Sequence, residues 1–215
     1  MEAAELARHL ISQARNSGRF LVAIAGPPAS GKSTIAVDLR AQLEAAGETA
    51  IVVPMDGFHF DDAILNARGD RPRKGAPHTF DVSGFAHLIH RIKLCEPDIA
   101  IGVFDRTLEL TRAGADIIDD KTKFILIEGN YLLLNHTGWK NLHEKFDYSI
   151  FIKTSINELE QRLIARWLDH GFDLAYAKNW IASNDLLNIK TVIADSVDAD
   201  LTITQDANGK TSAAS

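Results

Sequence analysis

The stretch Gly26-Pro27-Pro28-Ala29-Ser30-Gly31-Lys32-Ser33 decides the fold. It follows the apolar run Phe20–Ala25, and a segment of helical character begins at Thr34. The stretch matches the pattern G-x-x-x-x-G-K-[ST], and a position between a strand and a helix is the setting in which this pattern binds phosphate. The sequence therefore predicts a phosphate-binding loop.

Each residue type in this loop has a physical reason. Glycine at positions 26 and 31 permits unusual backbone torsions and close approach, so that successive N–H groups turn inward around a polyphosphate. The following helix adds the positive end of its dipole. Lys32 supplies charge for the β- and γ-phosphates, and the Ser33 hydroxyl is a ligand for Mg²⁺. The predicted nucleotide-binding residues here are Gly26, Pro27, Ala29, Ser30, Gly31, Lys32, Ser33 and Thr34.

The composition is that of an ordinary globular protein. The chain has 215 residues, 46% of them hydrophobic and 24% charged, and a net charge of −6 that argues against a general nucleic-acid or membrane-surface binder. Cys95 is the only cysteine, which excludes an intrachain disulfide and fits a reducing compartment. With no signal peptide and no membrane span in the sequence, we expect a cytoplasmic protein. A homodimer is compatible with the sequence, which does not set the oligomeric state.

Apolar runs alternate with amphipathic segments along the chain. Strands are predicted over residues 20–25, 49–54, 99–104, 124–127, 148–152 and 200–203, and helices over 3–13, 34–46, 82–94, 156–170 and 174–183. Residues 60–81 contain several glycines, prolines and arginines and are predicted to form a basic loop. The alternation predicts an α/β fold of three layers, with a mainly parallel sheet covered by helices and with ligands at the carboxyl ends of the strands. We predict a single domain over residues 1–205, with a small helical lid at about 160–185, and a disordered tail over 206–215.

Two carboxylates are predicted at strand ends beside the phosphate loop. Asp56 follows the second strand, and Glu128 follows the apolar run at 124–127. Phosphoryl transfer needs positioning, Mg²⁺ and a group that accepts the proton of the acceptor hydroxyl. Asp56 suits the base and Glu128 suits the metal. The structural alternative is that Asp56 begins a turn with Gly57 and that Glu128 caps the following segment.

Two arginines lie on one face of the predicted helix at 156–170. Arg162 and Arg166 are four residues apart, so both could close over the phosphates as a lid. The alternative is a solvated basic face near Glu158 and Glu160. The basic loop with Arg73 is likewise either a lip of the substrate site or solvated.

At this point the motifs resemble a family: the P-loop kinases grouped with uridine kinase, phosphoribulokinase and bacterial pantothenate kinase. The resemblance covers residues 20–203. Met55-Asp56-Gly57-Phe58 is similar to the family segment whose aspartate acts as base, and Ile127-Glu128-Gly129 is similar to its acidic strand end. The segment from Arg162 to Asp169 resembles the lid helix, whose arginine contacts the transferred phosphate, so the resemblance implies catalytic roles for Lys32, Asp56 and Arg166.

The acceptor region is also similar to this family. Lys74-Gly75-Ala76-Pro77 resembles a pantothenate kinase segment, and Val103-Phe104-Asp105-Arg106 occupies the place of an acceptor-binding segment. Arg106, Glu109 and His59 depart from the residues expected in pantothenate kinase or uridine kinase. The whole pattern is most similar to a bacterial branch described as fructokinase-like, pantothenate kinase-like or nucleoside triphosphate hydrolase domain proteins. The predicted substrate-binding residues are Asp56, His59, Arg73, Lys74, Asp105, Arg106, Arg112 and Asn184, and Arg162 joins the nucleotide site.

These observations predict a kinase that uses ATP and Mg²⁺ to phosphorylate a hydroxyl of a small metabolite. A sugar such as fructose is the first candidate, because a polar, charged acceptor region suits a hydroxyl-rich compound. Pantothenate and a nucleoside are the alternatives. A different class of function, a nucleoside triphosphatase that acts as a switch on a protein partner, also remains open.

Overall fold

The computed structural model describes residues 2–14, 18–105, 107–205 and 211–214. Its strands are β1 (Phe20–Ala25), β2 (Ala50–Pro54), β3 (Ile99–Asp105), β4 (Leu110–Ile118), β5 (Phe124–Gly129), β6 (Tyr148–Lys153), β7 (Leu201–Gln205) and β8 (Thr211–Ala214). Its α-helices are α1 (Ala3–Gln13), α2 (Lys32–Ala45), α3 (Asp62–Arg68), α4 (Val82–Lys93), α5 (Ile156–Asp169), α6 (Leu174–Trp180) and α7 (Leu186–Asp195). Short 3₁₀ turns are η1 (Met55–Phe58), η2 (Arg71–Arg73), η3 (Pro77–Thr79) and η4 (His143–Lys145), and η5 (Ile181–Asp185) is a π-helical turn.

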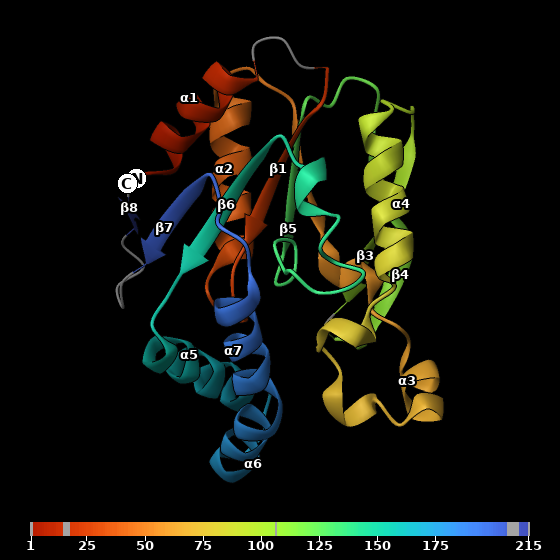
Figure 1. The fold of residues 1–215 in the computed structure, drawn as a ribbon, viewed down its shortest axis with the longest axis vertical. Helices are drawn as coiled ribbons and strands as arrows, with labels where there is room; N and C mark the ends of the chain where they lie inside the picture. Colours follow the sequence, from red (N-terminus) through yellow and green to blue (C-terminus); the bar gives the residue numbers. More distant parts are fainter. Residues whose placement is uncertain (1, 15–17, 106, 206–210, 215) are drawn as a thin grey trace.

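The main sheet has the strand order β2-β5-β1-β6-β7-β8 (Figure 1). Every neighbouring pair from β2 to β7 is parallel, and β8 is antiparallel to β7. The strand that leads into the phosphate loop, β1, lies inside the sheet between β5 and β6. The predicted α/β class with a mainly parallel sheet is confirmed.

The two faces of the sheet are covered by different helices, as the alternation of side chains along β1 requires. All six residues of β1 are buried. Val22 and Ile24 pack into the core beneath α1 and α2, whereas Leu21 and Ala23 pack into the core that contains α4. Figure 1 shows these layers, with α1 and α2 on one side of the sheet and α4 on the other. The apolar run at 20–25 is therefore a strand covered on both faces.

Helices α5, α6 and α7 lie beyond the carboxyl ends of the parallel strands (Figure 1). Helix α5, turn η5 and helix α7 share a small apolar core of Leu159, Leu163, Ile181 and Ile189. The predicted lid at about 160–185 falls on this helical group. The helix predicted at 174–183 corresponds to α6, which ends at Trp180. Helix α7 was not predicted; together with η5 it continues the chain to Asp195.

The strand at residues 99–104 is present, but it does not join the main sheet. It forms β3, which pairs antiparallel with β4 in a separate hairpin. No strand was predicted between residues 104 and 124, yet β4 begins at Leu110. Most of β4 is exposed, so its sequence lacks the apolar signal by which the buried strands were found.

The segment 60–81 is more regular than the predicted loop. It contains helix α3 and the turns η2 and η3. The Asp61 side chain caps α3 by accepting from the Ala63 N–H at 2.8 Å, and Gly69 ends the helix with a φ of 77°. Only Leu65 of α3 is buried, so the helix has no apolar face that periodicity could reveal.

At the carboxyl end, the predicted disordered tail falls mostly on residues outside the described ranges. The described part, Thr211–Ala214, is instead strand β8, whose backbone pairs with β7. Among the described residues, no helix combines the length and the apolar character that crossing a bilayer requires.

Candidate active site

The phosphate loop has the backbone that a polyphosphate cradle needs. Gly26 and Gly31 have φ values of 152° and 87°, and Ala29 has a φ of 62°. A Cβ on Gly26 would lie 2.7 Å from the Ile152 carbonyl oxygen, so glycine is required there for space as well as for torsion. The buried Ser30 hydroxyl has no hydrogen-bond partner among the described residues, which leaves it for a ligand oxygen. The loop therefore fits a nucleoside polyphosphate.

Helix α2 begins inside the loop and presents three predicted residues. Lys32 is 7% exposed, and its Nζ donates to the Pro27 carbonyl at 2.9 Å, so the side chain folds back along the loop. Ser33 and Thr34 are exposed in the first turn of the helix. The Ser33 hydroxyl and the N–H groups of the first helical turn, which have no acceptor within the helix, thus lie at the positive end of the helix dipole.

The register of the sheet brings both predicted carboxylates next to the loop. Glu128 on β5 is paired with Ile24 on β1 and with Pro54 on β2. Glu128 is 9% exposed, and Asp56 follows Pro54 by two residues in turn η1. Neighbouring strands lie roughly 5 Å apart, so this register brings Glu128 and the turn that carries Asp56 to the carboxyl ends of the strands, from which the loop also emerges.

Close backbone contacts fix turn η1 on two sides. A Cβ on Gly129 would lie 2.5 Å from the Met55 Cβ, and a Cβ on Gly57 would lie 2.2 Å from the Gly102 carbonyl oxygen. Only glycine permits this approach, so η1 is wedged between β5 and the hairpin. Asp56 is therefore held in a turn between β5 and β3.

Tyr131 is a buried tyrosine whose pKa depends on nearby charges. Tyr131 is fully buried, and its hydroxyl donates to the Gly75 carbonyl at 2.6 Å. Burial raises the pKa of Tyr131 far above its usual value, the charges of Asp56 and Asp185 raise it further, and the charge of Arg73 opposes them. Tyr131 thus stays neutral, and its hydroxyl joins the segment after β5 to the basic loop.

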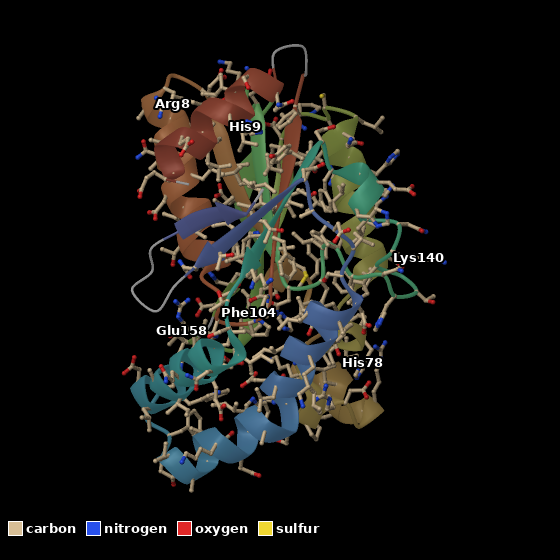
Figure 2. The ribbon with its side chains drawn as sticks, turned by 60° about the vertical axis from the view of Figure 1, so that its left-hand side comes forward. Arg8, His9, His78, Phe104, Lys140 and Glu158 are labelled. Carbon is tan, nitrogen blue, oxygen red and sulfur yellow. The ribbon has the colours of Figure 1, made fainter. Side chains whose placement is uncertain are left out.

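The lid arginine Arg162 contacts the phosphate loop directly. Its Nη1 donates to Gln205 Oε1 at 2.8 Å and to the Ala29 carbonyl at 3.4 Å, and its Nε donates to Glu158 Oε1 at 2.8 Å. Figure 2 shows Glu158 toward the end of the molecule that carries α5, with Arg8 and His9 at the opposite end. The structure therefore places Arg162 beside the phosphate loop, and Arg166 lies one helical turn farther along α5.

Sequence reasoning missed Gln205 as a site residue. It ends β7, and a Cβ on Gly31 would lie 2.8 Å from Gln205 Oε1. Its position directly after the last parallel strand was the available signal, because ligands gather at the carboxyl ends of such strands. Asp185 was also missed and has no motif around it.

Asn184 and Arg73 connect the lid to the basic loop. The Asn184 Nδ2 donates to the Lys74 carbonyl at 2.9 Å, and its buried Oδ1 has no hydrogen-bond partner among the described residues. Arg73 donates to the Ser183 carbonyl at 3.0 Å and to Asn188 Oδ1 at 3.1 Å. The loop that was predicted to be a substrate lip is thus joined to η5 and α7.

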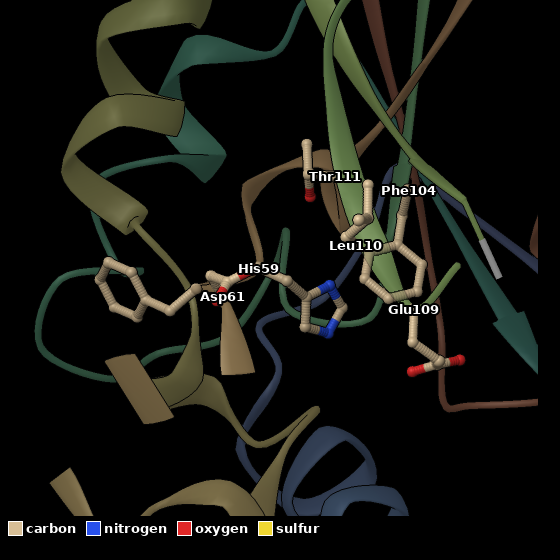
Figure 3. A pocket seen from close by; sticks show the side chains of 7 residues that line it. His59, Asp61, Phe104, Glu109, Leu110 and Thr111 are labelled. Carbon is tan, nitrogen blue, oxygen red and sulfur yellow. The ribbon is translucent and has the colours of Figure 1, made fainter. Parts of the chain in front are cut away.

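A small cavity of about 80 Å³ lies between η1, the start of α3 and the hairpin (Figure 3). The His59 ring is 4.0 Å from the Phe80 ring and 4.9 Å from the Phe104 ring, between centroids. His59 Nδ1 and the Asp56 carbonyl oxygen are 2.9 Å apart. The residues that line the cavity are His59, Phe60, Asp61, Phe104, Glu109, Leu110 and Thr111.

The charged residues of the acceptor side pair with one another. Lys74 Nζ is 2.8 Å from Asp62 Oδ1 and 3.5 Å from Glu109 Oε2. Arg112 Nε is 3.4 Å from Asp105 Oδ2 across the hairpin. The predicted contact residue Arg106 lies outside the described residues.

A larger hollow of about 690 Å³ opens on another part of the surface. None of the predicted site residues lines it. Its lining includes Pro77, His78, Val82, His136 and Trp139. Of the predicted acceptor residues, His59 lines the smaller cavity.

Known proteins resemble this chain over most of its length, although no family model matches it. The uncharacterized protein YggC of Escherichia coli is 31% identical over 194 residues, which cover 89% of this chain and 80% of YggC. A candidate uridine kinase, C227.14 of Schizosaccharomyces pombe, is 28% identical over 215 residues, 94% of this chain and 89% of that protein. The crystal structure of a candidate fructose transport system kinase from Silicibacter sp. TM1040 is 42% identical, with a TM-score of 0.88 and coverage of 94% of this chain and 98% of that one.

The chain belongs to the P-loop kinases that include uridine kinase, pantothenate kinase and phosphoribulokinase. It is a small-molecule kinase with the phosphate loop at residues 26–33.

Proposed function

We propose that this kinase transfers the γ-phosphate of ATP to a hydroxyl of a small metabolite, with a sugar such as fructose as the first candidate. The observation that carries the proposal is the strand register, which sets Glu128 and Asp56 beside the phosphate loop. A nucleotide on the loop then has one carboxylate near its metal and another near its acceptor.

The residues divide the chemistry among them. The Asp56 carboxylate takes the proton from the acceptor hydroxyl as that oxygen bonds to the γ-phosphorus, and the bond to the β,γ-bridging oxygen breaks to release ADP. Lys32 and the loop N–H groups hold the β- and γ-phosphates, Arg162 binds the nucleotide, and Arg166 meets the transferred phosphoryl group.

Ser33 and Glu128 would hold Mg²⁺, which supplies positive charge to the phosphates. The described residues hold no cluster of three or more His, Cys, Asp and Glu side chains that would cage a metal. This fits Mg²⁺, because that ion usually takes one or two protein ligands and fills its shell with phosphate and water oxygens.

The pairing of charges on the acceptor side favours an uncharged acceptor. Lys74 is neutralised by Asp62 and Glu109, and Arg112 is paired with Asp105. A carboxylate-bearing acceptor such as pantothenate would have to displace these internal partners, whereas a polyol only exchanges hydrogen bonds. The name of the Silicibacter neighbour, a candidate fructose transport system kinase, agrees with this preference.

The small cavity fits the end of the acceptor that lies away from the phosphate. Its volume of about 80 Å³ is well above the roughly 10–15 Å³ that one water needs. The Thr111 Oγ1 at its wall is buried and has no hydrogen-bond partner among the described residues, and the His59 ring lies at the same cavity (Figure 3). Hydroxyl groups match such partners, and Asp61 and Glu109 at the same wall disfavour an anion.

The test is ADP release from Mg-ATP with fructose and other ketoses, pantothenate, uridine and cytidine. We expect stimulation by an uncharged polyol, and we expect Asp56→Asn to lower turnover by about 10²-fold while sparing ATP affinity. Asp38→Asn on the exposed face of α2 is the matched control. Strong stimulation by pantothenate would instead identify an acceptor that carries a carboxylate. Full turnover in Asp56→Asn would show that Asp56 is not the base.

The alternative of a nucleoside triphosphatase switch predicts a different result in the same assay. ADP release would then be slow and indifferent to every compound, and it would rise on addition of a protein partner. The acceptor-side cavity next to Asp56 favours the kinase.

A further inference from the structure

Gln205 lies against the phosphate loop, although it belongs to no motif. It is the last residue of β7, and its side chain is half-buried. The three atoms Oε1, Nε2 and Cδ of its amide lie 2.8, 3.3 and 3.5 Å from the position that a Cβ on Gly31 would take. The amide therefore packs on the backbone at the point where the loop passes into α2. Glycine at residue 31 provides the φ of 87° and also the space for Gln205.

The same amide binds the lid arginine. Arg162 Nη1 donates to Gln205 Oε1 at 2.8 Å and to the Ala29 carbonyl at 3.4 Å, and Arg162 Nε donates to Glu158 Oε1 at 2.8 Å. A guanidinium only donates hydrogen bonds, so the amide atom that faces it has to be the oxygen. Gln205 and Glu158 hold two different nitrogens of one planar group. Together they fix the orientation of that plane.

These two contacts restrict the arginine in different ways. Glu158 and Arg162 are four residues apart on α5, so their ion pair orients the side chain relative to its own helix. Gln205 comes from β7, which pairs with β6 in the main sheet. Its hydrogen bond therefore ties the lid helix to the sheet and to the start of α2.

The chemistry of the amide suits a position beside bound phosphate. A neutral oxygen orients the guanidinium but leaves its positive charge available to an anion. A carboxylate at residue 205 would partly cancel the charge of Arg162 and would also repel a polyphosphate on the adjoining loop. Glutamine supplies the hydrogen bond without that repulsion.

We propose that Gln205 is a positioning residue that holds Arg162 on the phosphate loop in the orientation that receives the nucleotide. The assignment rests on the proposed function, in which Arg162 binds the nucleotide. Gln205 acts through the arginine. An arginine that is already ordered loses little conformational freedom when the ligand arrives, so the ordered state favours binding.

A purely structural role for Gln205 makes a different prediction. Its backbone pairs with Thr211 of β8, and that pairing does not depend on the side chain. If the side chain only stabilised the end of β7, its replacement would lower Tm and leave nucleotide affinity unchanged. Nucleotide affinity therefore separates the two roles.

The experiment is Gln205→Met, which keeps the length of the side chain and removes the amide oxygen. Calorimetry measures binding of the β,γ-imido analogue of ATP with Mg²⁺, in the absence of any acceptor. We expect the Kd to rise about 3-fold to 10-fold, with Tm nearly unchanged. Gln161→Met, at an exposed position of α5 next to Arg162, is the matched control and should bind as the wild type does.

A double-mutant cycle tests whether Gln205 acts through the arginine. Arg162→Met should weaken binding more than Gln205→Met does, and Gln205→Met should add almost nothing to Arg162→Met. Additive losses would overturn the proposal. An unchanged Kd in Gln205→Met would overturn it as well and, with a lower Tm, would make Gln205 structural.

Gln205→Glu is the second variant, in case Gln205→Met folds poorly. It keeps the shape and the acceptor oxygen but adds a negative charge beside the loop. We expect it to weaken binding of the analogue at least as much as Gln205→Met, and wild-type affinity would overturn the proposal. If the wild type itself does not bind the analogue with Mg²⁺, the proposed function has failed, and the assignment of Gln205 fails with it.

Discussion

The phosphate loop and the acceptor side of the site are assembled from the chain in different ways. The loop is one continuous stretch, held between β1 and α2, which are its neighbours in sequence. The acceptor side combines η1, the turn after η2 and the hairpin β3–β4, and it closes where Gly57 meets Gly102. The phosphate loop is thus a short local motif, whereas packing between distant segments forms the proposed acceptor side.

Breaking the phosphate loop should have the largest effect. Lys32→Ala removes the charge proposed to act on the β- and γ-phosphates, and we expect transfer to fall by about 10³-fold or more because preorganised charge is usually the largest catalytic contribution. Steady-state ADP formation measures the loss. Tm is measured alongside, since Lys32 Nζ also donates to the Pro27 carbonyl at 2.9 Å.

Lys123→Ala is the control for that change. Lys123 pairs with Glu48 at 3.1 Å and precedes β5, at the end of the strand opposite Glu128. Its loss should leave turnover near the wild-type value. Retention of more than about a tenth of the activity in Lys32→Ala would show that the loop binds nucleotide without acting on the transferred phosphate.

Breaking the acceptor side should have a smaller and more selective effect. In Gly57→Ala the new Cβ would lie 2.2 Å from the Gly102 carbonyl oxygen, so the hairpin must move away from η1. We expect a loss of roughly 1–3 kcal/mol of stability and a rise of about tenfold in the KM for the acceptor, with the KM for ATP little changed. Chemical denaturation and steady-state kinetics measure the two quantities.

Substitutions at two other glycines serve as comparisons for Gly57→Ala. In Gly102→Ala the new Cβ would lie 3.0 Å from the Thr111 Cγ2. This substitution should lower stability less than Gly57→Ala does, because a side-chain methyl group can move more easily than the backbone. Gly18→Ala meets Cys95 Sγ at 3.6 Å, an ordinary contact, and should be nearly neutral. An equal rise of both KM values in Gly57→Ala would mean that the two sides of the site are one rigid unit.

The smallest effect is expected from the ion pair between Lys74 and Asp62. Burial raises the pKa of Asp62, but hydrogen bonds and charges from Lys74 and Arg71 outweigh burial and hold it below its ordinary value of 3.8. A group whose pKa is lowered in the folded state stabilises the fold at pH values above its unfolded pKa. This stabilisation is lost as the pH falls through the folded-state pKa. Lys74→Met should therefore weaken the dependence of Tm on pH below about 4.

The matching control is Arg40→Met, which breaks an exposed pair with Glu44 on α2. Exposed pairs of this kind contribute little, so its pH profile should follow the wild type. A profile in Lys74→Met that is also identical to the wild type would show that Arg71 alone sets the charge state of Asp62.

Much of the phosphate end could be predicted from the sequence, because its signals are local. The strand before the loop, the loop glycines and the helix after it follow one another, and the apolar runs of β1 and β5 mark strands buried on both faces. The placement of Glu128 beside the loop also followed, since parallel strands end at the same edge of a sheet.

The acceptor end could not be predicted to the same degree. Strand β4 is exposed along most of its length, and α3 buries only Leu65, so neither carries a periodic apolar pattern. The pairing of Lys74 with Asp62 and the approach of Gly57 to Gly102 join residues far apart in sequence. The roles predicted for His59, Arg73 and Asn184 remain predictions for the acceptor experiment.

The hydrogen bonds of Arg73 to Ser183 and Asn188 have a consequence for how the two substrates bind. They join the lid segment to the basic loop, so a shift of either element is transmitted to the other. If each substrate favours the joined arrangement, linkage makes the benefit reciprocal: the factor by which nucleotide tightens acceptor binding equals the factor by which acceptor tightens nucleotide binding. An arginine that need not touch either reactant would then be the origin of their cooperativity.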